Sequence, residues 1–139
     1  METLIESHQY LLQYAIKPSV QRSAVMDFLL KNRIHPTIDE IYSALAPSMP
    51  TLSKTTVYNT LNLFRDRGLI REVIIDPKRV FYDPNTTPHH HLYNVDTGEI
   101  TDIESATLSV SGLPELPPGM VTEGVDIIVR VRASAASLG

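Results

Sequence analysis

Three hydroxyl residues divide the first half of this chain into segments with the periodicity of helices. Ser19, Thr37 and Ser53 each stand directly before a run in which apolar residues recur at helical spacing. A hydroxyl side chain at that place accepts a hydrogen bond from a backbone N–H group that the first helical turn leaves unpaired. The predicted helices span about residues 19–31, 37–46 and 53–67.

Two more patterns complete the first half of the chain. An amphipathic helix is predicted over residues 4–15, because Pro18 ends helical geometry shortly afterwards. Gly68 suits the end of the helix before it, and residues 69–75 and 80–82 are then predicted to form two strands joined by a turn. Short helices followed by a β-hairpin are the order of elements in a winged helix-turn-helix domain. The predicted fold class is therefore α+β.

The helix at residues 53–67 is the candidate recognition helix. Its apolar residues Val57, Leu61 and Phe64 lie on one face. The opposite face carries hydroxyl, amide and phenol groups, which hydrogen-bond to base edges and phosphates. The DNA-contacting residues predicted on this helix and at the hairpin turn are Lys54, Thr55, Tyr58, Asn59, Asn62, Lys78 and Arg79. A winged-helix domain that binds another protein is the alternative.

The stretch from Asp83 to Asp102 contains three of the five histidines of the chain. In a strand, His89 and His91 project to one face and His90 to the other. Residues 94–98 have the composition of a turn. Such a turn would fold the chain back and bring Asp102 near His91. Two imidazoles and two carboxylates can then converge, a mixture of ligands that suits Fe(II), Mn(II), Zn(II) or Co(II). A solvated histidine-rich loop is the alternative.

Composition excludes several classes of protein. No apolar run approaches the roughly 20 residues that cross a bilayer, and no signal peptide is recognisable, so we expect no membrane partner and a cytoplasmic location. The chain has no cysteine, which excludes disulfides and thiolate zinc sites. The net charge is −4, but residues 1–75 hold eight Lys/Arg against seven Asp/Glu, whereas residues 76–139 hold four against nine. The acidic half thus contains the predicted cation site.

The last part of the chain predicts a small domain that needs a partner. A short helix is predicted at residues 105–113, a loop with three prolines follows, and residues 125–131 alternate like a strand. About three strands and one short helix make a small core. An exposed strand edge of this kind usually pairs with another chain. We therefore expect a homodimer, which would present two recognition helices to a palindromic operator in double-stranded DNA.

Four motifs resemble the ferric uptake regulator family of metal-dependent repressors. They are His35-Pro36-Thr37-Ile38-Asp39-Glu40-Ile41-Tyr42, Ser53-Lys54-Thr55-Thr56-Val57-Tyr58-Asn59-Thr60-Leu61, Gly68-Leu69-Ile70-Arg71-Glu72 and His89-His90-His91. The match covers about residues 10–104 in order and spacing, and the last 35 residues match poorly. The resemblance implies a winged-helix DNA-binding domain at residues 1–83, a small α/β dimerisation and metal-sensing domain at 84–139, and a hinge near 83–88.

By position, the regulatory metal site of this family corresponds to His35, Asp83, His89, His91 and Asp102. The resemblance implies one regulatory divalent ion per protomer, Fe2+ or Mn2+ in the cell, with Zn2+ possible in vitro. The ion would tie the DNA-binding domain to the dimerisation domain, so that operator binding depends on metal. Lys17 and Arg22 correspond to basic positions near the DNA backbone, and Tyr58 corresponds to a residue that reaches the bases.

The chain departs from the family pattern in its second half. Asn94 and Thr97 stand where most members carry the first cysteine pair of a structural zinc site. We therefore expect no structural zinc held by four cysteines. Pro114, Pro117 and Pro118 interrupt the long helix that is usual in the dimerisation domain.

One residue bears on the signal that the protein senses. Asp102 stands where iron-sensing members tend to carry Glu, which resembles the peroxide-sensing branch. In that branch, Fe(II)-catalysed oxidation of a ligand histidine releases the DNA. A repressor that senses iron status, zinc or manganese is the alternative. A small metallohydrolase built on His89, His91 and an aspartate is another, although we expect no enzymatic activity.

Overall fold

The computed structural model describes residues 2–32, 35–87, 89–104 and 107–135. The chain divides into two compact units, Met1–Thr86 and Thr87–Gly139, which are called the helical unit and the strand unit below. All α-helices of the described residues belong to the helical unit. Among these helices, none is long and apolar enough to cross a membrane.

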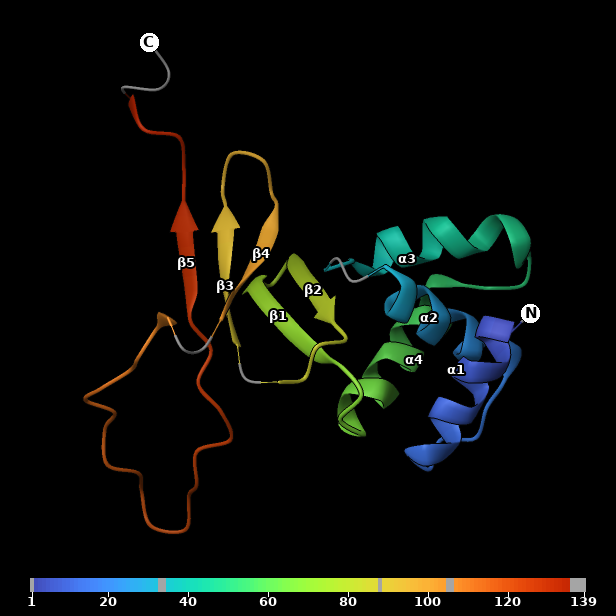
Figure 1. The fold of residues 1–139 in the computed structure, drawn as a ribbon, viewed down its shortest axis with the longest axis horizontal. Coiled ribbons are helices and arrows are strands. Elements are labelled where there is room, and N and C mark those ends of the chain that lie inside the picture. The colour runs from blue at the N-terminus through green and yellow to red at the C-terminus, as the bar shows by residue number, and fades with distance from the viewer. Residues whose placement is uncertain (1, 33–34, 88, 105–106, 136–139) are drawn as a thin grey trace. The chain divides into compact units, whose positions relative to one another are not determined.

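The helical unit consists of helices followed by a β-hairpin (Figure 1). Its elements are α1 Glu2–Gln13, α2 Val20–Lys31, α3 Ile38–Leu45, the short 3-10 helix η1 Ala46–Ser48, α4 Lys54–Asp66, β1 Arg71–Asp76 and β2 Arg79–Asp83. Strands β1 and β2 are antiparallel, with Glu72 opposite Tyr82. This succession confirms the predicted winged helix-turn-helix order.

The three predicted helix caps are formed. The side-chain oxygens of Ser19, Thr37 and Ser53 each accept a hydrogen bond from the backbone N–H three residues further on, at 3.1, 3.2 and 3.1 Å. Helix α4 is followed by Gly68 at φ +80°, a left-handed conformation that glycine adopts without steric cost. Local sequence signals therefore determine where α2, α3 and α4 begin and where α4 ends.

The core of the helical unit is apolar and continuous. Val57, Leu61 and Phe64 of α4 are fully buried, as their spacing predicted. They belong to one cluster of buried residues: Leu11, Ile16, Val25, Met26, Leu29, Ile41, Leu52, Val57, Leu61, Phe64, Leu69, Ile70 and Tyr82. Because α4 contributes its inner face to this cluster, its opposite face is held toward solvent.

The strand unit contains a three-stranded sheet formed by β3 His89–Asn94, β4 Ile100–Glu104 and β5 Ile128–Val131, in the order β4-β3-β5. Strand β4 is antiparallel to β3 and places Asp102 opposite His91. Strand β5 is parallel to β3 and places Ile128 opposite His91. The predicted turn contains Gly98 at φ +78°. The first two strands and their pairing therefore agree with the sequence prediction.

The segment between β4 and β5 differs from the prediction. Residues 107–113 form no α-helix, and residues 105 and 106 lie outside the described part of the chain. Gly112 has φ +75°, which a helix does not accommodate, and prolines follow from residue 114. The last strand is also shorter than expected, since it begins at Ile128 rather than near residue 125.

Candidate metal centre and nucleic-acid interface

In the helical unit, His35 and Asp83 form a pair although they are far apart in the sequence. The backbone N–H of Tyr82 donates a hydrogen bond to the carbonyl of Pro36 at 2.9 Å, which joins the segment before α3 to β2. The next residues on each side are His35 and Asp83, and the His35 Nε2 atom lies 3.1 Å from Asp83 Oδ2. The other carboxylate oxygen, Oδ1, accepts a hydrogen bond from the backbone N–H of Asn85 at 2.8 Å. Both side chains are largely buried.

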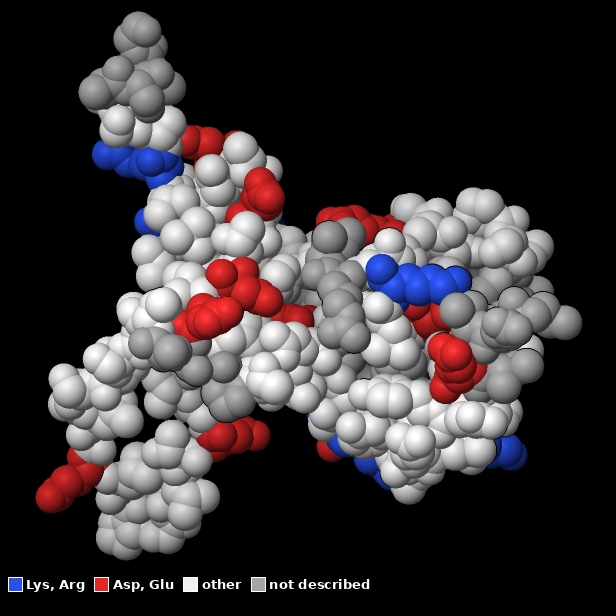
Figure 2. Space-filling model, in the orientation of Figure 1, with Lys and Arg blue, Asp and Glu red and all other residues white. Residues whose placement is uncertain are grey.

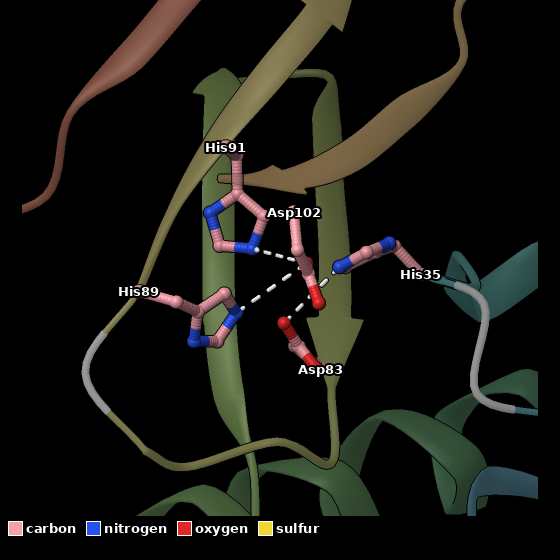
Figure 3. A group of neighbouring side chains, drawn as sticks. All are labelled: His35, Asp83, His89, His91 and Asp102. Atoms are coloured by element: carbon pink, nitrogen blue, oxygen red, sulfur yellow. Dashed lines mark hydrogen bonds and ion pairs between the residues drawn. The ribbon is translucent and has the colours of Figure 1, made fainter. Parts of the chain in front are cut away.

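In the strand unit, two imidazoles face one carboxylate. His89 and His91 project from the same face of β3, and both are buried, with 5% and 2% of their surface exposed. The Nε2 atoms of both rings lie 3.5 Å from Asp102 Oδ1 on the neighbouring strand (Figure 3). His90 points to the other face, where its Nδ1 atom accepts a hydrogen bond from the backbone N–H of Ile127 at 3.2 Å.

The tautomer of His89 follows from its backbone contact. Its Nδ1 atom lies 2.6 Å from the carbonyl oxygen of Thr87. A carbonyl oxygen only accepts hydrogen bonds, so Nδ1 must carry the proton and donate. In the neutral ring the lone pair then belongs to Nε2, which faces the Asp102 carboxylate. A cation between these two atoms would satisfy both, and a histidine fixed through its second nitrogen is usual for metal ligands.

The spacing of the donor atoms suits a metal ion. Zinc bonds to imidazole nitrogen and carboxylate oxygen are about 2.0–2.2 Å long, so two ligands on one ion lie roughly 3–3.5 Å apart. The distances between ligand atoms within each unit, 3.1 and 3.5 Å, fall in this range. His and Asp donors together are the set preferred by divalent transition metals. The residues present therefore fit a divalent metal ion.

The outer face of α4 is polar and accessible. Tyr58 is 50% exposed, and Thr55 and Asn59 are exposed as well, whereas Asn62 is partly buried. No acidic side chain lies on this helix before Asp66. The face therefore presents hydrogen-bonding groups without a negative charge that would repel phosphates.

An open pocket of about 550 Å3, with polar and apolar lining, lies beside this face. It is lined by Lys17, Pro18, Ser19, Gln21, Arg22, Thr56, Asn59, Thr60 and Leu63. The Arg22 guanidinium donates a hydrogen bond to the backbone carbonyl of Lys17 at 2.7 Å, which holds the Arg22 side chain against the segment before α2. Lys17, Arg22 and Asn59, predicted separately from the sequence, thus line one cavity. An anionic group such as a phosphate fits this lining.

Sequence reasoning missed part of this lining. Thr56 and Thr60 are one turn apart on α4, on the side that faces the start of α2. Gln21 joins them from α2. The spacing of the two threonines was available in the sequence, but which helix they faced was not.

Of the three other predicted cations, Lys54 and Arg79 form ion pairs within the chain, and Lys78 makes a backbone contact. Lys54 Nζ lies 3.0 Å from Asp39 Oδ1 and 5.8 Å from the centre of the Tyr42 ring. At the hairpin turn, Arg79 Nε lies 3.0 Å from Asp76 Oδ2, and the backbone N–H of Lys78 donates to Asp76 Oδ1 at 2.8 Å. All three cationic residues are exposed. The structure thus keeps them at the surface but does not bring them into the cavity at α2.

One buried tyrosine lies on β2 directly before the metal-competent Asp83. Tyr82 is 2% exposed, and burial, followed by the nearby charge of Glu72, raises the pKa of its phenol to about 12. Arg65 donates hydrogen bonds to Glu72 and Asp66, which raise the pKa of the guanidinium further. The carboxylates of Glu72 and Asp66 are therefore paired with Arg65, and the neighbouring Tyr82 keeps its proton.

Comparison with known sequences identifies relatives. Residues 13–112 match the family model described as Ferric uptake regulator family. The peroxide-responsive repressor PerR of Staphylococcus aureus strain Mu50 is 37% identical over 106 residues, which cover 76% of this chain and 72% of the relative.

Comparison with solved structures supports the same fold. The ferric uptake regulator of Pseudomonas aeruginosa with manganese has a TM-score of 0.68 at 19% identity and covers 91% of this chain and 97% of its own. The Vibrio cholerae ferric uptake regulator has a TM-score of 0.69 at 18% identity, with 91% and 98% covered. The Campylobacter jejuni peroxide stress regulator has a TM-score of 0.60 at 22% identity, with 96% and 98% covered.

Proposed function

The chain belongs to the ferric uptake regulator family, and we propose that it is a metal-dependent, DNA-binding repressor that responds to peroxide. The observation that carries this proposal is the group formed by the buried His89 and His91 with the more exposed Asp102, which fits a divalent ion, in a chain that also has a winged helix. A 37% identical relative is a peroxide-responsive repressor, which supports the choice of signal.

The proposed metal site combines the pair and the group of three ligands described above. His35 and Asp83 would come from the helical unit, and His89, His91 and Asp102 from the strand unit, to bind one Fe2+ or Mn2+ per protomer. Zn2+ would also bind in vitro, because the donor set suits it. A bound ion would restrict motion of the winged helix about the hinge near residues 83–88. Bound metal would then raise the affinity for the operator, and bound operator would raise the affinity for metal by the same factor, since coupling between two binding sites is reciprocal.

The proposed DNA interface uses the polar face of α4. Thr55, Tyr58, Asn59 and Asn62 would read base edges from the major groove. The predicted cationic residues would contact phosphates; they are Lys17, Arg22, Lys54, Lys78 and Arg79. For Lys54 and Arg79 this requires exchange of an aspartate partner for a phosphate. Two copies in a homodimer would bind the two halves of a palindromic operator on chromosomal DNA, in the cytoplasm.

The proposed response to peroxide is oxidation of a ligand histidine. When Fe2+ is bound, it supplies the electron transfer that activates hydrogen peroxide. In the net reaction, the imidazole C–H carbon gains one oxygen atom from hydrogen peroxide and one molecule of water is released. His89 is rigidly oriented by Thr87 and buried, which supports a reaction at a fixed ring. An oxidised ring would bind metal less well, and the operator would be released.

The metallohydrolase alternative has less support. A hydrolytic metal site needs an open coordination position and a general base. The five proposed ligands would leave little room for substrate, and the relatives are described as regulators. A structural zinc site made of cysteines is not part of the proposal, because this chain has no cysteine.

The first test measures operator binding under anaerobic conditions with no metal, with Mn(II) and with Fe(II). DNA from the region upstream of the protein's own gene serves as the operator. We expect both metals to promote binding, and brief peroxide to release DNA and add one oxygen to a histidine only in the Fe(II) form, by intact mass and peptide mapping. If peroxide changes neither mass nor binding, the protein senses metal and not peroxide. Metal-independent binding would refute a regulatory metal altogether.

Matched variants separate the ligands from their neighbours. His91→Ala removes a proposed ligand, whereas His90→Gln changes the adjacent residue on the opposite face and keeps an acceptor for the Ile127 N–H. We expect His91→Ala to abolish metal-dependent operator binding and His90→Gln to retain it. Equal behaviour of the two variants would contradict the proposed ligand set.

A further inference from the structure

Two of the cations proposed to contact DNA are held by carboxylates of the same unit. Lys54 Nζ lies 3.0 Å from Asp39 Oδ1, and Arg79 Nε lies 3.0 Å from Asp76 Oδ2. All four side chains reach solvent, with 37–77% of their surface exposed. A phosphate group can therefore approach either cation, but in the free protein a carboxylate is already beside it.

The contact of Lys54 is made with two residues of α3. Its ammonium group lies beside Asp39 and also 5.8 Å from the centre of the Tyr42 ring, and these two residues are one turn apart on α3. Lys54 is the first residue of α4, where a positive charge opposes the helix dipole, and the first turn of α4 contains no acidic side chain. Lys54 therefore does not stabilise its own helix and relies on α3 for a counter-charge.

The second pair belongs to the turn of the β-hairpin. Asp76 is the last residue of β1, Arg79 is the first residue of β2, and the two are partners in the strand register. The other carboxylate oxygen, Asp76 Oδ1, accepts a hydrogen bond from the backbone N–H of Lys78 at 2.8 Å. The turn thus fixes the carboxylate beside the Arg79 guanidinium.

These two pairs matter because the helical unit has little net positive charge. Residues 1–86 contain ten Lys/Arg and nine Asp/Glu. Figure 2 shows one face of the molecule, on which Lys and Arg side chains stand singly or beside Asp and Glu. Lys17 and Arg22, which line the pocket beside α4, have no carboxylate partner among the described residues. Affinity for DNA of any sequence depends on cations that neutralise phosphates, so a carboxylate paired with such a cation competes directly with DNA.

We propose that Asp39 and Asp76 are autoinhibitory: in the free protein they occupy Lys54 and Arg79, and DNA phosphates must displace them. An exposed ion pair is weak, so the aspartates lower the affinity for DNA without preventing binding. The inference rests on the DNA interface of the proposed function and adds a feature that sets the affinity of this interface.

The inhibition acts on DNA of every sequence. Phosphates are the same in every duplex, whereas base edges differ. The two aspartates therefore lower the affinity for random DNA and for the operator by the same factor. Weak binding to DNA in general leaves the contribution of bound metal to decide whether the operator is occupied.

Binding of the metal-free full chain to a random-sequence duplex tests the proposal, measured by fluorescence anisotropy at low salt. Asp39→Asn and Asp76→Asn each remove one negative charge and keep a carbonyl oxygen, which for Asp76 preserves an acceptor for the Lys78 N–H. The matched control is Asp27→Asn, which changes the net charge equally and breaks the ion pair with Lys31 on α2, a cation outside the proposed DNA interface. We expect each of the first two variants to bind DNA about two- to fivefold more tightly, and the control to bind like the wild type.

Removal of the partner cation isolates each pair. In a Lys54→Ala background, Asp39→Asn should change DNA binding no more than Asp27→Asn does, because no paired cation is left to release. The same holds for Asp76→Asn in an Arg79→Ala background. A gain that persists without the cation, an equal gain in Asp27→Asn, or no gain in either aspartate variant would overturn the proposal. The two pairs lie on different elements, so if circular dichroism shows a loss of helix in one variant, the other variant remains as the test.

The operator test described above separates this inference from the proposed function. Metal should strengthen operator binding by the same factor in the wild type and in Asp39→Asn, since the aspartate competes with phosphates in both metal states. Operator binding that does not depend on metal, together with tighter DNA binding in the aspartate variants, would refute only the repressor. Metal-dependent operator binding, together with aspartate variants that behave like Asp27→Asn, would refute only the autoinhibition.

Discussion

The buried phenol of Tyr82 predicts a specific loss of stability in alkaline solution. Burial, together with the charge of Glu72 on the paired strand, raises the pKa of Tyr82 from 10.0 to about 12. In the unfolded chain the phenol loses its proton near pH 10, whereas in the folded chain it keeps the proton until about pH 12. The unfolded state therefore binds fewer protons between these values, so the free energy of unfolding falls as the pH rises. The contribution is fully present below about pH 10.

The size of the effect follows from the pKa difference. Each pKa unit corresponds to about 1.4 kcal/mol, so a raise of two units lowers the free energy of unfolding by up to about 3 kcal/mol above pH 12. At about pH 11 the expected loss from Tyr82 alone is about 1.4 kcal/mol. Domains of this size are usually stable by only about 5–15 kcal/mol, so the loss is measurable.

Urea unfolding of the metal-free protein provides the assay. Circular dichroism of the helices reports the helical unit, because every described α-helix belongs to it. Tyr82→Phe retains the ring and removes the titrating phenol, so the difference between the two proteins reports the Tyr82 group. We expect the wild type to lose about 1.4 kcal/mol more than Tyr82→Phe between about pH 9 and pH 11. Parallel losses would mean that the Tyr82 phenol ionises in the folded chain as it does in the unfolded chain.

Three further predictions concern the core, a cap and the DNA interface. Leu61→Ala removes a fully buried side chain and should lower the free energy of unfolding by about 2–5 kcal/mol in urea titrations, and a change below 1 kcal/mol would contradict the packing of α4. Ser53→Ala removes the hydroxyl that accepts a hydrogen bond from the Thr56 N–H and should lower the free energy of unfolding by about 1 kcal/mol. Ser53→Asp keeps an acceptor and should retain most of the stability. Equal losses in the two variants would exclude the cap. Tyr58→Ala should weaken operator binding roughly ten- to hundredfold, measured by fluorescence anisotropy. The affinity for metal, measured by calorimetry, should not change. Unchanged operator affinity would remove Tyr58 from the interface.

Local signals explain which features the sequence predicted well. A cap depends only on a hydroxyl and a backbone N–H three residues away, so Ser19, Thr37 and Ser53 marked the starts of their helices correctly. The common face of His89 and His91 follows from the period of a strand, and the turn that brings Asp102 opposite His91 is formed by adjacent residues. The short helix expected after β4 was wrong over its described residues, because Gly112 adopts positive φ there.

Features that depend on contacts between distant residues required the tertiary structure. The spacing of histidines and aspartates between Asp83 and Asp102 does not indicate His35, which only the family resemblance assigned to the metal site. In the structure a backbone hydrogen bond between Tyr82 and Pro36 brings His35 next to Asp83. The cavity at the start of α2 likewise combines residues from two helices. The sequence by itself determined the helices, the hairpins and the side chains that strand alternation aligns, because these depend on neighbouring residues. Only the tertiary structure decided which of these elements contact one another, because packing of a common core is a property of the whole folded unit.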